Sequence, residues 1–329
     1  MKKVLITGIG GQDGSYLTEL LLTKGCEVYG IERNSDSRIS REVRKTFIED
    51  IQNLSLVFRI LEEVSPDEVY HLAAQSSIPT SINFPEETIR ENVGGISNIL
   101  EAIKQKAPRA KFYFAGSSEM FGKPLETPQT EKTQFNPRNA YGSSKVSGFH
   151  LTKDYRERFG IFSCTGITYN HESPRRREEF VTRKITSGLA KIRKGVLKQF
   201  SLGNLDAKRD WGFAGDYVEA MWLMLQQDIP DDYIIATGET HSVREFVEIA
   251  AKELEMNLEW MGEGINEVGI DKNTGKEIVY VDPKFFRPAE VDLLLGDASK
   301  ARQKLGWKPK VRFGELVKMM VEEDMKVIN

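Results

Sequence analysis

The sequence has few of the residues that build metal centres, disulfide scaffolds or membrane anchors. Its 329 residues include two cysteines and four histidines, which are too scattered for a disulfide framework or a zinc motif. No apolar run approaches the ~20 residues of a membrane-spanning helix, and the amino-terminal run is too short for a secretory signal. A net charge of −3 gives no reason to expect a nucleic-acid partner. We therefore expect a cytoplasmic globular protein that binds no metal, membrane or nucleic acid.

Glycine is concentrated at the amino terminus, between an apolar run and a helical pattern. Val4–Thr7 predicts a buried strand, and Ser15–Lys24 predicts a helix. The glycines between them stand three residues apart, at Gly8, Gly11 and Gly14. Glycines let the backbone approach a pyrophosphate, and the N-terminus of the following helix offers N–H donors. The turn therefore predicts a dinucleotide site, in which Asp13 is expected to point its carboxylate away from the phosphates.

Strand and helix patterns alternate through the first half of the chain. The other predicted strands are Glu27–Ile31, Thr46–Glu49, Glu68–Ala73, Lys111–Gly116 and Phe162–Ile167. The other predicted helices are Leu54–Val64, Pro85–Gln105 and Tyr141–Phe159. Repeated strand–helix units predict an α/β fold with a doubly wound, parallel, Rossmann-type sheet. Ligands bind such sheets beyond the carboxyl ends of the strands, where Gly8, Ala73 and Ser117 are expected.

The regular alternation stops near residue 170. Basic runs, short strands and a glycine-rich stretch follow, although Asp216–Gln226 is again helical. We expect a dinucleotide-binding Rossmann domain over residues 1–169, with residues 212–236 packing back on it. Residues 170–211 and 237–329 are expected to form a smaller α/β lid that binds the substrate.

Tyr141 and Lys145 stand four residues apart in a predicted helix and therefore share a face. An ammonium beside a phenol favours the phenolate, which lowers the pKa of the tyrosine from about 10. A hydroxyl at Ser117 can hydrogen-bond a substrate oxygen that Tyr141 deprotonates. Glu119 is a carboxylate that can act as general base and then acid. It is alternatively a carboxylate that merely favours a helix N-terminus.

The glycine turn, the strand order, Ser117 and the Tyr141/Lys145 pair together resemble the short-chain dehydrogenase/reductases. Longer motifs resemble one family of that group, the GDP-mannose 4,6-dehydratases. These motifs are Gly11 to Leu17, Asn170 to Arg176, Phe180 to Ile185, Leu202 to Gly212, Ala236 to His241 and Phe286 to Asp292. The resemblance spans nearly the whole chain. It implies a hydro-lyase of nucleotide-sugar metabolism, on the route to GDP-fucose or another deoxyhexose.

The resemblance also implies individual roles. The implied catalytic residues are Ser117, Glu119, Tyr141 and Lys145. The cofactor is implied to be NADP, with NAD as the alternative, and Arg33 is implied at its 2′-phosphate. The implied cofactor contacts are Gly8, Ile9, Gly10, Gly11, Gln12, Asp13, Gly14, Arg33, Asn34, Asp50, Ile51, Leu72, Ala73, Ala74, Gln75, Ser76, Tyr141, Lys145, His171 and Arg176. The implied contacts to GDP-mannose are Ser76, Ser117, Ser118, Glu119, Asn170, Val181, Lys184, Arg209, Arg287 and Glu290.

The chain departs from the family pattern after its second strand. The family has paired arginines and a serine-rich loop there, whereas this chain has Glu32-Arg33-Asn34-Ser35-Asp36 and a shorter stretch before Asp50. Glu32 follows Gly14 by about 18 residues, near where an acidic residue binds the ribose of NAD. The resemblance implies that this loop helps to assemble tetramers in the family, so the shorter loop makes a homodimer the expected alternative to a homotetramer.

The departures leave two further functions open. One is a related GDP-sugar enzyme: a GDP-manno-heptose 4,6-dehydratase, a 4-ketoreductase or an epimerase. The other is a non-catalytic protein that binds NADP and a GDP-sugar.

Overall fold

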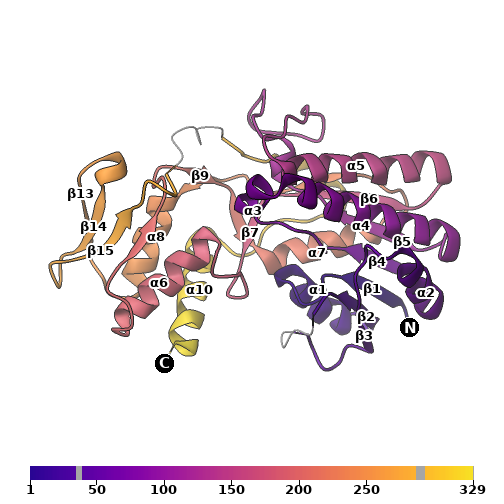
Figure 1. The fold of residues 1–329 in the computed structure, drawn as a ribbon, viewed down its shortest axis with the longest axis horizontal. Helices are drawn as coiled ribbons and strands as arrows, with labels where there is room; N and C mark the ends of the chain where they lie inside the picture. The colour runs from indigo at the N-terminus through magenta and orange to yellow at the C-terminus, as the bar shows by residue number, and fades with distance from the viewer. Residues whose placement is uncertain (35–38, 287–292, 329) are drawn as a thin grey trace. The chain divides into compact units, whose positions relative to one another are not determined.

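The structure is a computed structural model that describes residues 1–34, 39–286 and 293–328 (Figure 1). The chain divides into two compact units, which are described separately. Unit 1 comprises Met1–Tyr169, Ala214–Thr237 and Gly296–Lys308. Unit 2 comprises Asn170–Phe213, Gly238–Leu295 and Pro309–Asn329. Over the described ranges, no helix has both the length and the apolar character needed to cross a membrane.

Unit 1 is built on a seven-stranded sheet in which every pairing is parallel. Its strands are β1 (Lys3–Thr7), β2 (Glu27–Glu32), β3 (Lys45–Ile48), β4 (Glu68–His71), β5 (Lys111–Ala115), β6 (Ser163–Thr168) and β11 (Tyr233–Ile235). Their order across the sheet is β11-β6-β5-β4-β1-β2-β3, so the winding direction reverses between β1 and β4. The predicted doubly wound Rossmann-type sheet is therefore confirmed. The sequence analysis missed β11, a three-residue strand too short to carry a periodic signal.

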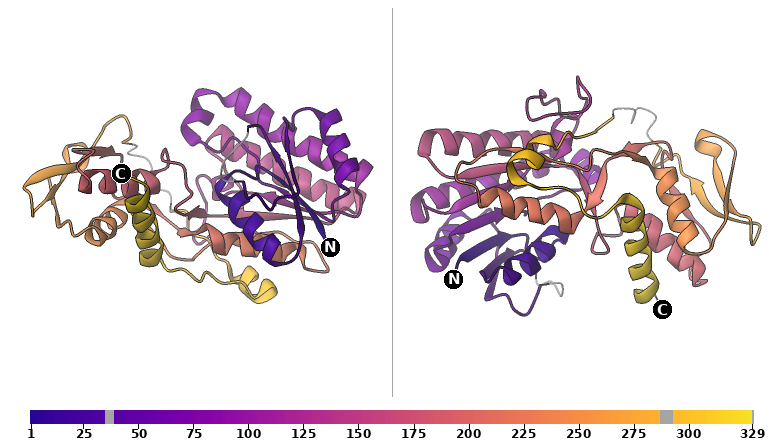
Figure 2. Two further views of the ribbon diagram at one scale, coloured as in Figure 1. Left: turned by 90° about the horizontal axis from the view of Figure 1, so that it is seen from below. Right: turned by 180° about the vertical axis from the view of Figure 1, so that it is seen from behind.

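Helices cover both faces of this sheet. They are α1 (Gln12–Thr23), α2 (Leu54–Val64), α3 (Ile78–Asn83), α4 (Pro85–Lys106), α5 (Ala140–Phe159), α7 (Ala214–Leu225) and α9 (Ser299–Leu305), with a 3₁₀ turn η1 (Ser118–Met120). Helices α1 and α7 pack together, whereas α4 packs against α2 and α5, and Figure 2 shows these two groups on opposite faces. Each face of the central strands is thereby removed from water.

Helix α2 illustrates why these segments are helical. Val57, Ile60, Leu61 and Val64 recur at helical spacing, are buried, and form one core cluster with residues of α4 and of the sheet. The side chain of Asn53 caps the helix by accepting a hydrogen bond from the backbone N–H of Leu56 at 3.3 Å. A polar cap and an apolar stripe therefore fix both the start and the buried face of α2.

One segment of unit 1 lies outside the predicted boundaries. Residues 296–308 were expected in the second domain, but α9 packs on β11 and α7 of unit 1. The indole N–H of Trp307 donates to the carbonyl oxygen of Asp216 at 2.8 Å, and Lys300 Nζ donates to that of Asp232 at 2.8 Å. The tertiary contacts of a buried tryptophan decide this placement, and local sequence patterns do not report such contacts.

The described residues of unit 2 form small sheets, three α-helices and a 3₁₀ turn, η2 (Gly264–Asn266). Strand β7 (Asn170–Glu172) pairs in parallel with β10 (Trp211–Phe213), and β9 (Lys208–Arg209) pairs in antiparallel fashion with β12 (His241–Ser242). A four-stranded sheet is ordered β13 (Leu258–Met261), β14 (Val268–Asp271), β15 (Lys276–Val281) and β8 (Phe200–Leu202). The helices α6 (Val181–Arg193), α8 (Val243–Glu253) and α10 (Phe313–Val327) contribute to one apolar core around Trp211 and Phe246.

Candidate active site

Four groups of predicted site residues in unit 1 follow the carboxyl ends of four neighbouring strands. The glycine turn follows β1, Arg33 follows β2, the segment 72–76 follows β4, and Ser117 comes shortly after β5. Because these strands are adjacent and parallel, their carboxyl ends meet at one edge of the sheet. The fold therefore brings together residues that are widely separated in sequence. Within the described part of the chain, no group of three or more His, Cys, Asp or Glu side chains is placed to hold a metal ion.

The glycine turn packs tightly against the segment after β4. Gly8 has a φ of +72°, and a Cβ atom there would lie 2.9 Å from the backbone nitrogen of Ala73. A Cβ on Gly14 would lie 2.4 Å from the carbonyl oxygen of Gly8. Helix α1 starts at Gln12 with no side-chain hydrogen bond from its cap, Gly11. Its first N–H groups can therefore bind an anion such as a pyrophosphate.

Asp13, in the first turn of α1, interacts with its neighbour Gln12 and acts electrostatically on two buried side chains. Gln12 Nε2 donates a hydrogen bond to Asp13 Oδ1 at 3.1 Å. The Asp13 carboxylate also acts on Lys145, where it opposes the lowering of the pKa by burial. Burial raises the pKa of Tyr113 well above its ordinary value, and the charge of Asp13 adds to that rise. The electrostatic influence of Asp13 thus extends to Lys145.

The segment after β4 is tied to α5 by an asparagine that the sequence analysis missed. Asn92 on α4 is only 7% exposed, and its Oδ1 accepts from the backbone N–H of Gln75 at 2.8 Å. Its Nδ2 donates to the carbonyl oxygen of Gln75 at 3.0 Å and to Ser144 Oγ at 2.9 Å. Ser144 in turn donates to the carbonyl oxygen of Tyr141 at 2.7 Å. Nothing in the local pattern distinguishes Asn92, because its partners come from other elements.

Lys145 lies beneath Tyr141 on the same face of α5, as its spacing predicted. It is 4% exposed, and its Nζ donates to the carbonyl oxygen of Ala115 at 2.7 Å. The same Nζ lies 5.6 Å from the ring centre of Tyr141 and 5.0 Å from that of Phe114. Burial lowers the pKa of Lys145 to about 8. The residue is therefore mostly a cation at neutral pH and begins to lose that charge in mildly alkaline solution.

Glu119 is held by Asn139, which the sequence analysis also missed. Asn139 Oδ1 caps α5 by accepting from the backbone N–H of Gly142 at 2.7 Å. Asn139 Nδ2 donates to Glu119 Oε2 at 2.9 Å. Ser117 Oγ caps η1 by accepting from the backbone N–H of Glu119 at 3.2 Å. One amide thus joins the carboxylate to the helix of Tyr141, and an Asn before a helical pattern is a recognisable capping signal.

We call Ser117, Glu119, Asn139, Tyr141 and Lys145 the catalytic cluster. It combines a hydroxyl, a phenol beside a buried ammonium, and a carboxylate whose orientation is fixed by an amide. The hydroxyl, the phenol and the ammonium suit proton removal from an alcohol. The carboxylate adds a second proton-transfer group, which oxidation of an alcohol alone does not require.

Two other predicted cofactor contacts follow β3. Asp50 is exposed, and its Oδ1 lies 4.0 Å from Nε of Arg33. Ile51 is buried in the core cluster beside the sheet. Its carbonyl oxygen accepts a hydrogen bond from Asn98 Nδ2 at 2.9 Å. The two neighbours therefore differ, since Asp50 faces solvent and Ile51 faces the core.

The predicted cofactor contacts of unit 2 lie in or near β7. His171 is in β7, and Arg176 follows it. Nε of Arg176 lies 3.1 Å from Glu172 Oε2, and the guanidinium lies 3.7 Å from the ring centre of Phe180. The neighbouring Arg177 is largely exposed. Of these two arginines, Arg176 is the less exposed, whereas Arg177 forms a 3.8 Å ion pair with the exposed Glu179.

The predicted substrate contacts of unit 2 come from separate elements. Asn170 opens β7, Val181 opens α6, and Arg209 closes β9, where it pairs with His241. Lys184 on α6 holds its Nζ 4.1 Å from the ring centre of Phe285, and burial lowers its pKa. Arg287 and Glu290 fall outside the described residues.

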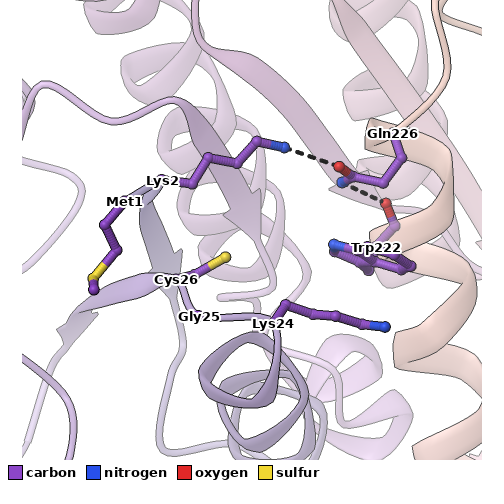
Figure 3. A pocket seen from close by; sticks show the side chains of 7 residues that line it. All are labelled: Met1, Lys2, Lys24, Gly25, Cys26, Trp222 and Gln226. Carbon is purple, nitrogen blue, oxygen red and sulfur yellow. Dashed lines mark hydrogen bonds between the residues drawn. The ribbon is translucent and has the colours of Figure 1, made fainter.

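A cavity of about 400 Å³ lies at the opposite edge of the unit 1 sheet (Figure 3). It is lined by Met1, Lys2, Lys24, Gly25, Cys26, Trp222 and Gln226. Lys2 Nζ donates to Gln226 Oε1 at 2.9 Å, and Lys24 Nζ lies 4.3 Å from the ring centre of Trp222. Met1 and Lys2 lie at the amino end of β1 and residues 24–26 at that of β2, whereas Trp222 lies on α7 and Gln226 directly follows it. This cavity is separate from the catalytic cluster.

Comparison with known proteins identifies related sequences. The family model described as GDP-mannose 4,6 dehydratase matches residues 5–320. A GDP-mannose 4,6 dehydratase of Drosophila melanogaster is 48% identical over 343 residues, which cover 99% of this chain and 87% of the fly protein.

Solved structures resemble this chain more closely in fold than in sequence. The UDP-glucose 4-epimerase of Thermus thermophilus, in complex with NAD, has a TM-score of 0.84 at 24% identity, covering 99% of this chain and 100% of its own. RMD from Pseudomonas aeruginosa, complexed with NADPH, has a TM-score of 0.82 at 20% identity, covering 100% of both chains. At these identities the likeness establishes the fold alone.

Proposed function

The chain belongs to the GDP-mannose 4,6-dehydratase family, and we propose that it converts GDP-D-mannose to GDP-4-keto-6-deoxy-D-mannose with loss of water. The observation that carries this proposal is the Glu119 carboxylate, which Asn139 joins to the helix of Tyr141 and Lys145. Simple oxidation of an alcohol uses the tyrosine and the lysine. Removal of water next to the new ketone needs a further group that transfers protons, and Glu119 is that group.

The proposed cofactor is a nicotinamide dinucleotide. The glycine turn and the first N–H groups of α1 fit its pyrophosphate, because both the backbone approach and the donors are present. When bound, it supplies the acceptor for the hydride of C4 and the donor that returns a hydride to C6. NADP is the form that the family resemblance implies, with Arg33 at the 2′-phosphate and NAD as the alternative.

Tyr141 and Lys145 carry the proposed first proton transfer. Tyr141 removes the proton of the C4 hydroxyl, while Ser117 hydrogen-bonds the same oxygen. The Lys145 ammonium, 5.6 Å from the ring centre of Tyr141, favours the phenolate that this step requires. The hydrogen bond from Lys145 to the carbonyl oxygen of Ala115 fixes the ammonium in that position.

Glu119 carries the proposed second step. A ketone at C4 makes the proton on C5 acidic, and Glu119 removes that proton. The carboxyl group then protonates the C6 hydroxyl as it leaves, so the proton from C5 departs in the water molecule. A proton from Tyr141 or from solvent finally replaces the one lost from C5. Because the hydride taken from C4 returns to C6, the conversion consumes no dinucleotide.

The GDP part is proposed to contact residues of unit 2. Asn170, Val181, Lys184 and Arg209 are the described candidates, and Arg287 and Glu290 complete the proposed set. Arginine suits this role because its planar fork binds phosphate oxygens in a bidentate manner. The proposed setting is the cytoplasm, and the proposed assembly is a homodimer or a homotetramer.

The direct test is to incubate the purified protein with GDP-mannose and a trace of NADP⁺ or NAD⁺. We expect the product mass to fall by one water while the reduced dinucleotide does not accumulate. Glu119→Gln is the matched control, because it keeps the size of the side chain and one acceptor oxygen for Asn139 but cannot accept the C5 proton. Stoichiometric consumption of reduced dinucleotide, or inversion at C4 without loss of water, would instead identify a reductase or an epimerase.

A further inference from the structure

The end of β2 places a carboxylate directly against the glycine turn. Glu32 is the last residue of β2, and its Oε2 accepts a hydrogen bond from the backbone N–H of Gly10 at 2.9 Å. Its Oε1 accepts from the backbone N–H of Arg33 at 3.2 Å. Two backbone donors therefore fix both carboxylate oxygens. The negative charge is held beside the turn that, under the proposed function, binds the dinucleotide.

Arg33, the residue implied at a 2′-phosphate, is engaged by carboxylates. One of its terminal nitrogens lies 2.8 Å from Glu91 Oε2, and its Nε lies 4.0 Å from Asp50 Oδ1. The hydrogen bond to Glu91 is the main cause of a raised pKa for Arg33, and Glu32 and Asp50 add to it. We call Glu32, Arg33, Asp50 and Glu91 the ribose corner. Negative charge predominates among these four side chains.

A 2′-phosphate fits this arrangement poorly. It would bring up to two further negative charges to a corner that already holds three carboxylates. Arg33 would also have to leave Glu91 in order to bind it. A ribose 2′-hydroxyl has the opposite requirement, because it donates a hydrogen bond and a fixed carboxylate accepts one.

We infer that Glu32 selects NAD over NADP in this chain. The inference rests on the proposed function only in taking the glycine turn as the dinucleotide site. It concerns which form of the cofactor that site accepts. The competing explanation is structural: Glu32 merely supports the glycine turn, and Arg33 moves freely to a phosphate.

The test is calorimetric titration of the protein with NAD⁺ and with NADP⁺, without GDP-mannose. The wild-type protein is expected to bind NAD⁺ more tightly. In Glu32→Gln the affinity ratio should shift toward NADP⁺ by about tenfold, because one repulsive charge near the phosphate is removed. Glu27→Gln is the matched control, since Glu27 begins the same strand that Glu32 ends. The ratio of NAD⁺ to NADP⁺ affinity in this variant should stay at the wild-type value.

A second variant tests the corner without touching the glycine turn. Glu91→Gln releases Arg33 from its 2.8 Å ion pair and should improve binding of NADP⁺ but not of NAD⁺. Tighter binding of NADP⁺ by the wild-type protein, with a ratio that Glu32→Gln leaves unchanged, would overturn the inference while the dehydratase proposal stands. Binding of neither dinucleotide would overturn the cofactor site itself. If Glu32→Gln does not fold, the wild-type ratio still tests the preference for NAD⁺, and Glu91→Gln still tests the role of the corner.

Discussion

The catalytic cluster and the ribose corner both lie in unit 1, where Ser117 comes after β5 and Glu32 ends β2, but they are built in different ways. Lys145 is 4% exposed and hydrogen-bonded to backbone, whereas Arg33 and Asp50 are 48% and 52% exposed and interact as ions in contact with solvent. Buried hydrogen bonds are costly to break, and exposed ion pairs contribute little. The comparison indicates that Lys145 is fixed rigidly, whereas Arg33 and Asp50 can change at little cost to the fold.

The largest expected effect of a substitution is at Glu119. In Glu119→Gln the amide keeps its place beside Asn139 but cannot accept the C5 proton. Loss of water should slow by about 10²–10⁴-fold, the usual contribution of a general base. Dinucleotide binding should be unchanged, and C4 oxidation should still reduce a bound dinucleotide in a single turnover, which absorbance follows. Turnover near the wild-type rate would remove Glu119 from the mechanism.

Lys145→Met should separate activity from stability. The variant loses the charge that favours the Tyr141 phenolate, so kcat should fall by about a hundredfold or more. Stability at neutral pH should not fall comparably, because a cation buried at a cost is replaced by an apolar chain of similar length. Parallel measurements of kcat and of the urea midpoint would check this. A variant that unfolds more readily yet turns over normally would contradict it.

The lowered pKa of Lys145 predicts opposite pH trends for activity and for stability. Its pKa is about 8 in the folded chain and 10.5 ordinarily, so the folded state releases this proton first. As pH rises through about 8, Lys145 loses its charge and kcat/KM of the wild-type enzyme should fall. Between pH 8 and 10.5 the unfolded state binds more protons, so this residue adds stability as pH rises. A kcat/KM that does not change from pH 7 to 10 would contradict a role for the Lys145 charge in the reaction.

Substitution of Asn139 should have an intermediate effect on kcat. Its two functions, capping α5 and donating a hydrogen bond to Glu119, can be separated. Asn139→Ala removes the cap of α5, at about 1 kcal/mol of stability, and also removes the donor to Glu119. Asn139→Ser keeps a capping oxygen but does not place an amide donor on the carboxylate. We expect the Ser variant to keep nearly the wild-type Tm while kcat falls by about tenfold, the change expected for one lost hydrogen bond. Equal kcat in the Ser variant and the wild type would show that Asn139 only caps the helix.

The smallest expected effect on the fold is in the ribose corner. Asp50→Asn removes an ion pair between two half-exposed side chains at 4.0 Å. The free energy of unfolding should change by less than about 0.5 kcal/mol. Urea unfolding of this variant beside Asn139→Ala would measure the contrast directly. A destabilisation as large as that of Asn139→Ala would show that the ribose corner is structural after all.

Local sequence patterns predicted the sheet and the shared helix face of Tyr141 and Lys145. They did not predict the hydrogen bonds that orient the candidate site. The alternation of strands and helices in unit 1 and the four-residue spacing of Tyr141 and Lys145 are local properties, and the structure contains them. Asn92 was missed because its partners lie on two other elements. Strand β11 and the segment 296–308 were missed because tertiary packing determines their place.

The most direct test of the central claim, that unit 1 carries a dehydratase site, follows one hydrogen atom. GDP-mannose labelled with deuterium at C4 would be converted in ordinary water and the product examined by NMR. The account predicts deuterium at C6, because the hydride taken from C4 is returned within the same molecule, and a solvent-derived or Tyr141-derived proton at C5. Deuterium that accumulates on free dinucleotide, or that returns to C4, would contradict it.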